Sequence, residues 1–196
     1  SGFEPMTTAA TTPDRSGTAV VLYAGTLYEK FDLTPLYQGV AVARDAGDVT
    51  ADQLRFRFVG RLNERVRRES SAHGVEEFFH VSPPVSREDV LAMMAEATAL
   101  LLPLYQDDPY SLPMKFFEYV GSGRPIVAIG PAERFAAQLV ADNGFGLVAS
   151  GAEDARSLVV RVVADPAGLP RPTPETAAGF TWEATTRTLA RILERL

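Results

Sequence analysis

Two ionisable residues, Lys115 and Glu118, stand three positions apart in the segment SLPMKFFEYVGSGRP, residues 111–125. If this segment is a helix, its free amides and roughly half a positive charge from the helix dipole form an anion site at its start. Lys115 can reach the same anion, and Glu118 follows about 4.5 Å further along the axis on nearly the same face. An ammonium for phosphate and a carboxylate for two hydroxyl groups match a ribose diphosphate. On these two residues alone, however, an ordinary exposed ion pair is the simpler explanation.

The helix that carries these residues has recognisable boundaries in the sequence. Ser111 is a suitable N-cap, Pro113 is tolerated in the first turn, and Gly121 or Gly123 can end the helix before Pro125 starts a strand. Another face of the helix is apolar and is expected to pack against a sheet: Met114, Phe117 and Val120.

Short apolar and β-branched runs alternate with helix-like stretches along most of the chain. The predicted strands cover 19–24, 54–60, 78–81, 98–104, 125–130 and 145–149. The predicted helices cover 33–45, 62–72, 86–96, 112–121, 133–141 and 153–163. Strict alternation predicts an α/β fold, a doubly wound, Rossmann-like parallel sheet of about six strands with helices on both faces.

The two ends of the chain differ from this alternating region. Residues 1–18 are rich in Thr, Ser, Pro and Gly and predict a linker, and the domain proper covers 19–164. A proline-rich loop is predicted over 165–179, and a final amphipathic helix over 180–196. The apolar residues of that helix recur at helical spacing: Leu189, Ile192, Leu193 and Leu196.

The composition argues against several classes of protein. With 196 residues and 46% hydrophobic content, one compact domain is the expectation. The net charge of -6 and the scattered arginines disfavour nucleic acid as a partner, because phosphate backbones need clustered positive charge. The absence of cysteine excludes disulfides and thiolate zinc sites and fits a reducing cytoplasm. No apolar run approaches the roughly 20 residues of a membrane span, and we expect no signal segment.

The turns after the predicted strands are the places to look for a site, because ligands of open parallel sheets bind beyond the carboxyl ends of the strands. Glycine stands at three of these turns, Gly25, Gly60 and Gly130, and allows a ligand to approach the backbone closely. Neither G-x-G-x-x-G nor G-x-x-x-x-G-K-[ST] occurs, so a dinucleotide or P-loop site has no motif support. The adjacent Asp107 and Asp108 are interpreted as a solvated turn, so no metal is expected.

The order of these segments resembles the C-terminal, donor-binding domain of the group 1 (family 4) glycosyltransferases, which have the two-domain GT-B fold. Six segments follow in the family's order: SGFEP, VVLYAGTLYEKFDL, FRFVGRLNERV, FFHVSPPVSREDVLAMMAEATALLLPL, SLPMKFFEYVGSGRPIVAI and GFTWEATTRTLARIL. The most specific is SLPMKFFEYVGSGRPIVAI, which is similar to P-x-K-x-x-E-Y-x-A-x-G-x-P-V. With six segments in order, a nucleotide site becomes the favoured interpretation of Lys115 and Glu118.

The resemblance implies transfer of a sugar from a nucleotide diphosphate to an acceptor hydroxyl, with retention of anomeric configuration and without a metal or other cofactor. It assigns the catalytic site to Lys115, at the diphosphate, and to Glu118, on the ribose hydroxyls. The turn from Val81 to Pro84 corresponds to the segment whose backbone contacts the base. The donor-binding set that the resemblance implies is Gly25, Thr26, Lys30, Arg61, Val81, Ser82, Pro84, Tyr110, Ser111, Leu112, Pro113, Met114, Lys115 and Glu118.

Two positions depart from the family pattern. Tyr110 stands where the first glutamate of E-x7-E contacts the donor sugar, and Thr26 stands where many members carry an arginine. Lys30 lies near the position of a further family lysine, and Arg61 is a candidate supplement. Phosphate binding is therefore expected to depend more heavily on Lys115.

Two other functions stay open: a degenerate, non-catalytic nucleotide-sugar-binding or scaffold domain, and half of a sugar-nucleotide epimerase of the same fold. The two departures favour the first, and the scarcity of histidine, with only His73 and His80, argues against the second. The expected partners are a nucleotide-diphosphate sugar and an N-terminal acceptor domain that this chain lacks, so the chain alone is expected to be inactive. Trp182 is expected to anchor the last helix on a neighbouring domain. We expect a cytoplasmic location, at the inner face of the membrane if the missing domain attaches there.

Overall fold

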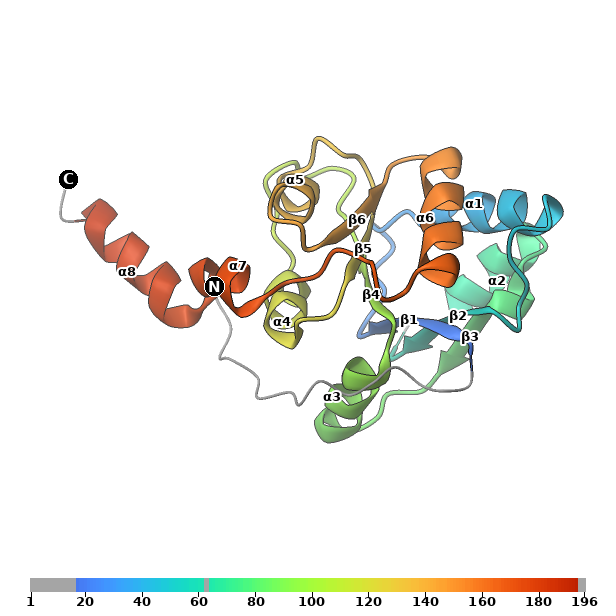
Figure 1. Ribbon diagram of the computed structural model, residues 1–196, viewed down its shortest axis with the longest axis horizontal. Helices are drawn as coiled ribbons and strands as arrows, with labels where there is room; N and C mark the ends of the chain where they lie inside the picture. Colours follow the sequence, from blue (N-terminus) through green and yellow to red (C-terminus); the bar gives the residue numbers. More distant parts are fainter. Residues whose placement is uncertain (1–16, 62–63, 194–196) are drawn as a thin grey trace.

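The computed structural model describes residues 17–61 and 64–193 and confirms the predicted α/β class. A sheet of six parallel strands forms its centre (Figure 1), in the order β3-β2-β1-β4-β5-β6. The strands are β1 (Ala19–Ala24), β2 (Leu54–Val59), β3 (Phe79–Ser82), β4 (Ala99–Pro103), β5 (Ile126–Ile129) and β6 (Gly146–Ala149). The strand order reverses between β1 and β4, so their carboxyl ends form the switch point where open α/β sheets bind ligands.

Helices cover both faces of the sheet (Figure 1). On one face lie α1 (Thr34–Asp45), α2 (Glu64–Ala72) and α6 (Ala152–Ala164), which share one hydrophobic core with the strands. On the other face lie α3 (Arg87–Glu96), α4 (Met114–Ser122) and α5 (Phe135–Asp142), around a second core. The doubly wound arrangement is therefore the one that the alternating sequence predicts.

The central strands β1, β4 and β5 are buried on both faces, which explains their nearly continuous apolar sequences. In β1, Val21 and Tyr23 enter the core shared with α1 and α6, whereas Leu22 and Ala24 enter the core shared with α4 and α5. Successive side chains of a strand point to opposite faces, so one apolar run supplies both cores. Burial of each large apolar side chain contributes about 1.5–3 kcal/mol, before the entropy cost of ordering the chain.

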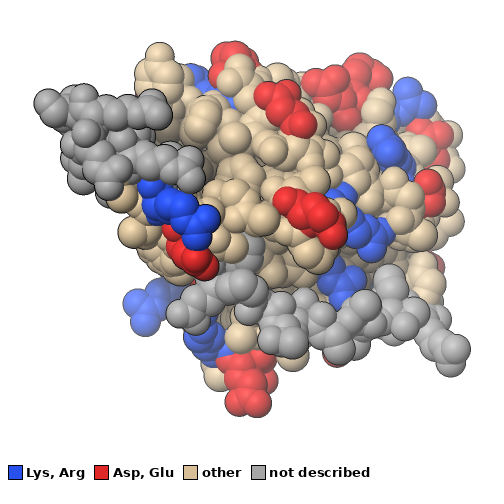
Figure 2. Space-filling view, turned by 60° about the vertical axis from the view of Figure 1, so that its left-hand side comes forward, with Lys and Arg blue, Asp and Glu red and all other residues tan. Residues whose placement is uncertain are grey.

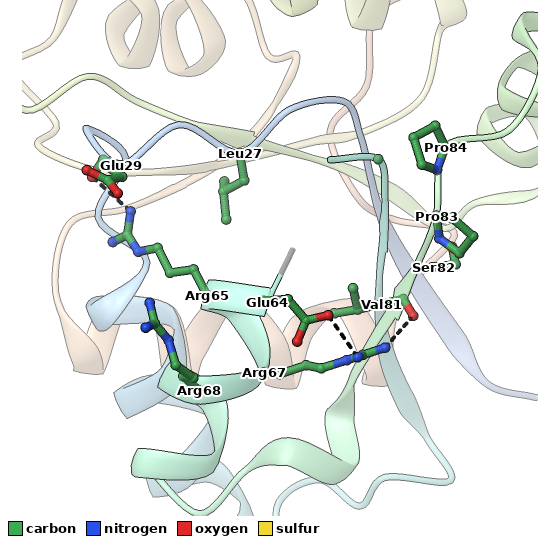
Figure 3. A pocket seen from close by; sticks show the side chains of 11 residues that line it. Leu27, Glu29, Glu64, Arg65, Arg67, Arg68, Val81, Ser82, Pro83 and Pro84 are labelled. Carbon is green, nitrogen blue, oxygen red and sulfur yellow. Dashed lines mark hydrogen bonds and ion pairs between the residues drawn. The ribbon is translucent and has the colours of Figure 1, made fainter. Parts of the chain in front are cut away.

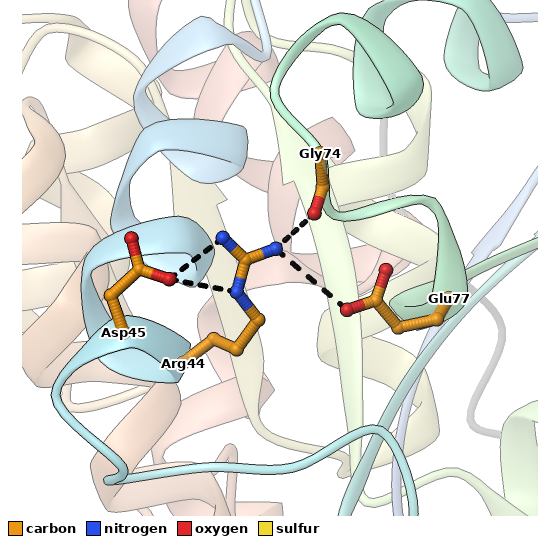
Figure 4. Close-up of polar contacts among 4 residues, drawn as sticks. All are labelled: Arg44, Asp45, Gly74 and Glu77. Carbon is orange, nitrogen blue, oxygen red and sulfur yellow. Dashed lines mark hydrogen bonds and ion pairs between the residues drawn. The ribbon is translucent and has the colours of Figure 1, made fainter.

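A surface cluster joins α1 to the turn before β3. The Arg44 guanidinium lies 2.7 Å from Asp45 and 3.8 Å from Glu77, and it donates a hydrogen bond to the Gly74 carbonyl (Figure 4). Glu77 belongs to the 3-10 helix η1 (Glu76–Phe78). Partly exposed pairs of this kind contribute about 0–1 kcal/mol, so we assign this cluster to local structure.

The segment predicted as a proline-rich loop over 165–179 is only partly a loop. It contains the short helix α7 (Pro174–Ala177), which is followed by η2 (Ala178–Phe180). A reciprocal cap starts α7, because the Thr173 hydroxyl accepts from the Thr176 amide and the Thr176 hydroxyl accepts from the Thr173 amide. Proline suits the first turn of a helix, so Pro174 begins one where composition alone suggested a loop.

The last helix, α8 (Trp182–Leu193), is present and extends away from the body of the domain (Figure 1). Phe180 fastens the turn before it by packing edge-on against Phe116 and Phe145, with ring centroids 5.4 and 5.3 Å away. Trp182 is 47% exposed, so the anchor role expected for it stays a prediction. Two further sequence predictions lie largely outside what the structure describes: residues 1–16 of the linker predicted over 1–18, and the side chains of the apolar stripe, Leu189, Ile192, Leu193 and Leu196.

The charged surface is mixed in sign. Figure 2 shows lysine and arginine side chains interspersed with aspartate and glutamate on one face of the molecule. Within the described ranges, no helix combines the length and the apolar character that a membrane-spanning segment needs.

Candidate functional site

The turns at the carboxyl edge of the sheet are built on glycines in a backbone conformation that other residues rarely adopt. Gly25 after β1, Gly60 after β2 and Gly130 after β5 have φ angles of 147°, 147° and 143°. A Cβ on Gly60 would collide with the Gly25 carbonyl, so the first two turns pack backbone against backbone. All three glycines thus lie at the edge where a ligand is expected.

Lys115 reaches across from α4 to the end of β1. Its ammonium donates a hydrogen bond to the Ala24 carbonyl and lies 5.5 Å from the centre of the Tyr23 ring. A Cβ on Gly25 would lie 2.6 Å from the Lys115 Cε, so the lysine lies directly against the glycine turn. Burial lowers the pKa of Lys115 below its ordinary value, and the charge of Glu118 partly offsets this effect. Lys115 is thus directed at the β1 turn, and not into the exposed ion pair that the spacing also allowed.

Helix α4 begins at Met114, with Pro113 as its N-cap residue. The prediction of Ser111 as N-cap is therefore wrong. Pro113 has φ -59° and ψ 140°, so the backbone stays extended through the proline and turns helical only after it. Gly123, with φ 68°, ends the helix in the left-handed conformation, as the sequence predicts for one of its two candidate glycines.

The faces of α4 agree with the prediction except at its first turn. Phe117 and Val120 are buried, whereas Met114, expected on the same face, is 57% exposed. As the first helical residue, Met114 lies at the open edge of the sheet beyond the core. Glu118 is exposed, and none of the described residues donates a hydrogen bond to it. Its carboxylate is therefore available to a ligand.

Two adjoining cavities lie at the ends of β1, β2 and β3. One, of about 710 Å³, is lined by Leu27, Glu29, Gly60, Glu64, Arg65, Arg67, Arg68 and Val81–Pro84 (Figure 3). The other, of about 220 Å³, shares Gly60 and Pro84 with the first. Together they contain six residues of the predicted donor-binding set: Gly25, Thr26, Arg61, Val81, Ser82 and Pro84. The turn predicted to face the base thus lies beside the turn predicted to approach the phosphates.

A third cavity, of about 210 Å³, lies between the loop after β1 and the loop after β4. Its walls are Lys30, Tyr105, Asp107, Asp108 and Ser111. The Lys30 ammonium lies 3.9 Å from the centre of the Tyr105 ring, a cation–π contact. Lys30 and Ser111, distant in sequence, therefore meet beside the start of α4.

The remaining residues of the predicted set belong to α4 and the loop before it, and they line none of these three cavities. Tyr110 is 83% exposed, Leu112 packs partly against the core, and Pro113 is buried. Tyr110 therefore lies on the surface, and the donor-sugar position that the resemblance gives it stays a prediction. Lys115 approaches the site through its contact with Gly25.

The arginines of α2 are site residues that sequence analysis missed. Arg65, Arg67 and Arg68 all line the larger cavity, and Arg67 pairs with Glu64 at 3.0 Å and donates to the Val81 carbonyl at 3.4 Å (Figure 3). The run ERVRRE closely follows a strand that ends in glycine. That position was the available signal, because the helix after a strand begins at the ligand-binding edge of the sheet.

Neither histidine is placed for catalysis. His73 packs edge-on against Tyr37, and His80 lies on β3, where burial lowers its pKa below the ordinary value. In the described ranges, no group of three or more His, Asp or Glu side chains lies close enough together to hold a metal ion.

Comparison with solved structures agrees with the fold. Solved structures with the same fold include the lipopolysaccharide outer core galactosyltransferase WaaB, with TM-score 0.68 and 19% identity over 100% of this chain and 54% of that one. HepE from Anabaena, in complex with UDP-glucose, has TM-score 0.65 and 14% identity over 91% and 49%. WaaG, a glycosyltransferase involved in lipopolysaccharide biosynthesis, has TM-score 0.60 and 18% identity over 88% and 44%. The chain spans about half the length of these proteins.

The family assignment comes from the sequence itself. No curated protein gave a significant match to the chain. Residues 18–165, which include the whole sheet and all three cavities, match the family described as glycosyl transferases group 1. This chain therefore belongs to the group 1 glycosyl transferases.

Proposed function

We propose that this chain is the donor-binding half of a retaining glycosyltransferase that moves a sugar from a nucleotide diphosphate to an acceptor hydroxyl without a metal. The observation that carries the proposal is the position of Lys115. Its ammonium extends from α4 to the carboxyl end of β1 and lies against a glycine that has no side chain to block a ligand. A cation at the switch point of an open α/β sheet is suited to bind a diphosphate.

Lys115 would stabilise the negative charge that develops on the departing diphosphate. The side chain is largely buried, and a charge in such an environment acts on its neighbours more strongly than one in water. Gly25 allows the phosphates to approach the backbone. Lys30, at the neighbouring cavity, would add a second positive charge at the same edge.

Glu118 and the larger cavity would hold the nucleoside. Glu118 is exposed on the turn of α4 that follows Lys115, where its two oxygens can accept hydrogen bonds from both ribose hydroxyls. The Val81–Pro84 wall of the larger cavity would contact the base. Two solved structures of the same fold support a nucleotide ligand, HepE with UDP-glucose and the pneumococcal O-GlcNAc transferase GtfA with UDP and GlcNAc.

We further propose that the acceptor is bound by a second domain, because the chain spans about half of the enzymes that share its fold. The chain alone then binds donor and turns over little. A degenerate binding domain is the second candidate, favoured by Tyr110 and Thr26 at positions where the family carries a glutamate and an arginine. Sugar transfer in the presence of a chelator, by this chain together with its acceptor domain, would favour the enzyme over the degenerate binding domain and would support metal independence.

Calorimetric titration with UDP, GDP, ADP and dTDP tests the donor site directly. We expect one diphosphate to bind preferentially, and we expect Lys115→Met and Glu118→Ala each to abolish most of that binding. Glu183→Ala, which removes an exposed carboxylate of α8, is the matched control and should bind normally. Equal binding by wild type and both site variants would refute the proposal, as would the failure of all four diphosphates to bind.

A further inference from the structure

Arg65 connects α2 to the loop after β1 with charge-assisted hydrogen bonds. Its Nη1 donates to the Glu29 carbonyl at 2.8 Å (Figure 3). The same Nη1 donates to the Tyr28 carbonyl at 3.4 Å, and its Nε lies 2.6 Å from the Glu69 carboxylate. The Arg65 and Glu69 side chains are only 21% and 32% exposed. Charge-assisted bonds are stronger than neutral ones. The bond to Glu69 is also partly shielded from water, whereas the two bonds to the loop carbonyls are exposed. Arg65 therefore attaches the loop after β1 to α2 and is not a solvated surface charge.

Glu69, the partner of Arg65, lies close to helix α1. Its carboxylate lies beside the buried Tyr37 hydroxyl of α1, where burial and then the Glu69 charge raise the pKa of Tyr37 above its ordinary range. Neither the Tyr37 hydroxyl nor the Glu69 Oε2 atom has a hydrogen-bond partner among the described residues. The bond between Arg65 Nε and Glu69 Oε1 is therefore the contact that joins this carboxylate to the guanidinium.

In the loop that Arg65 holds, Lys30 directly follows Glu29, whose carbonyl accepts the Arg65 hydrogen bond. On the far side of Lys30 the same loop is held a second time, because Phe31 forms an isolated antiparallel bridge with Tyr105 and stacks on its ring at 4.8 Å. The Lys30 ammonium lies over that ring, at the wall of the cavity that also contains Ser111. Lys30 is therefore held between two attachment points, of which Arg65 is the upstream one.

We propose that Arg65 is a positioning residue for the donor diphosphate: it holds the loop after β1 so that Lys30 presents its ammonium at the edge of the site. This inference rests on the proposed donor-binding function. Arg65 acts through Lys30 and does not touch the ligand. The role explains why an arginine that lines the larger cavity directs two of its bonds at backbone carbonyls instead of into the open space.

A double-mutant cycle with Lys30 separates positioning from direct contact. The probe is whichever of UDP, GDP, ADP and dTDP the wild-type chain binds most tightly. We expect Arg65→Met and Lys30→Met each to weaken binding about tenfold, and the double variant to bind no more weakly than Lys30→Met alone. Arg65→Lys should recover part of the loss, because an ammonium can still donate to the Glu29 carbonyl.

The matched control is Arg187→Met in α8, which breaks an ion pair of the same i,i+4 spacing and the same 2.6 Å length outside the site. Its affinity should equal that of the wild type. Hydrogen exchange of the amides from Gly25 to Phe31 supplies a readout that needs no ligand. Exchange there should be faster in Arg65→Met and unchanged in Arg187→Met.

Several outcomes would overturn the proposal, and they are distinguishable. Wild-type affinity in Arg65→Met, or wild-type exchange in its loop, would remove the positioning role while the donor site stands. Losses that multiply in the double variant would mean that Arg65 contacts the ligand itself. If the wild-type chain binds none of the four diphosphates, the proposed function fails, and the assignment of Arg65 to donor binding fails with it.

Discussion

A methyl group on Gly25 should separate the stability of the β1 turn from its function. In Gly25→Ala the new Cβ would lie 2.6 Å from the Lys115 Cε and 2.7 Å from its Nζ, closer than carbon and nitrogen atoms approach without a shift. The Lys115 chain end must move away and give up its hydrogen bond to the Ala24 carbonyl. The backbone is strained as well, because alanine rarely adopts a φ of 147°.

The expected losses follow from these two effects. The strain should lower the free energy of unfolding by about 1–3 kcal/mol. Displacing the Lys115 ammonium should remove a charge-assisted interaction with the diphosphate, about 1.5–3 kcal/mol, or a roughly 10- to 150-fold weaker affinity. Urea unfolding measures the first loss and calorimetric titration the second.

Gly130→Ala is the control for strain. Its φ of 143° is similar, but its new Cβ would meet the Leu104 Cβ at 2.8 Å instead of Lys115. We expect Gly130→Ala to be destabilised and to keep its affinity for the diphosphate. If Gly25→Ala folds and binds as tightly as the wild type, or if both variants lose affinity equally, the placement of Lys115 at the phosphates is wrong.

Three further predictions concern the ribose, the lysine charge and the C-terminal turn. Glu118→Ala should weaken the binding of a ribonucleoside diphosphate by about 1.5–3 kcal/mol and leave the binding of its 2′,3′-dideoxy analogue unchanged, as calorimetry with the two ligands would show. Folding lowers the pKa of Lys115, so its charge destabilises the folded chain at neutral pH, and this cost disappears as the pH rises toward 10.5. The unfolding free energy of the wild type, measured relative to that of Lys115→Met, should therefore rise with pH. A difference that does not change with pH would contradict the burial of the ammonium. Phe180→Ala, which removes edge-on contacts with Phe116 and Phe145, should lower the unfolding free energy by on the order of 2 kcal/mol in urea titration, and a neutral effect would mean that the turn before α8 is not packed on the core.

The fold could be predicted because its signals are local. Apolar runs with flanking glycine or proline define the strands, and alternation with helical stretches suffices for a doubly wound sheet. Helix ends that depend on the backbone conformation of single residues were harder to predict from the sequence. The extended conformation of Pro113 shifted the N-terminus of α4 past Ser111, and the reciprocal threonine cap made a helix within the segment predicted as a loop.

The candidate site shows the same division. The spacing of Lys115 and Glu118 on one helix is a local signal and indicated a diphosphate and ribose site. The direction of Lys115 is not local, because the carbonyl that it binds belongs to Ala24, 91 residues away in the sequence. The bonds from Arg65 to the loop after β1 are also distant in sequence, with a separation of 36 residues between Arg65 and Glu29. The periodicity of the sequence therefore could not predict them.

A crystal structure of the chain with the tightest-binding nucleoside diphosphate tests the proposed donor site most directly. We expect the terminal phosphate at the Gly25 turn, within hydrogen-bond distance of the Lys115 ammonium, and both ribose hydroxyls on the Glu118 carboxylate. A nucleotide whose phosphates lie among the α2 arginines, with Lys115 still bonded to the Ala24 carbonyl, would contradict this expectation.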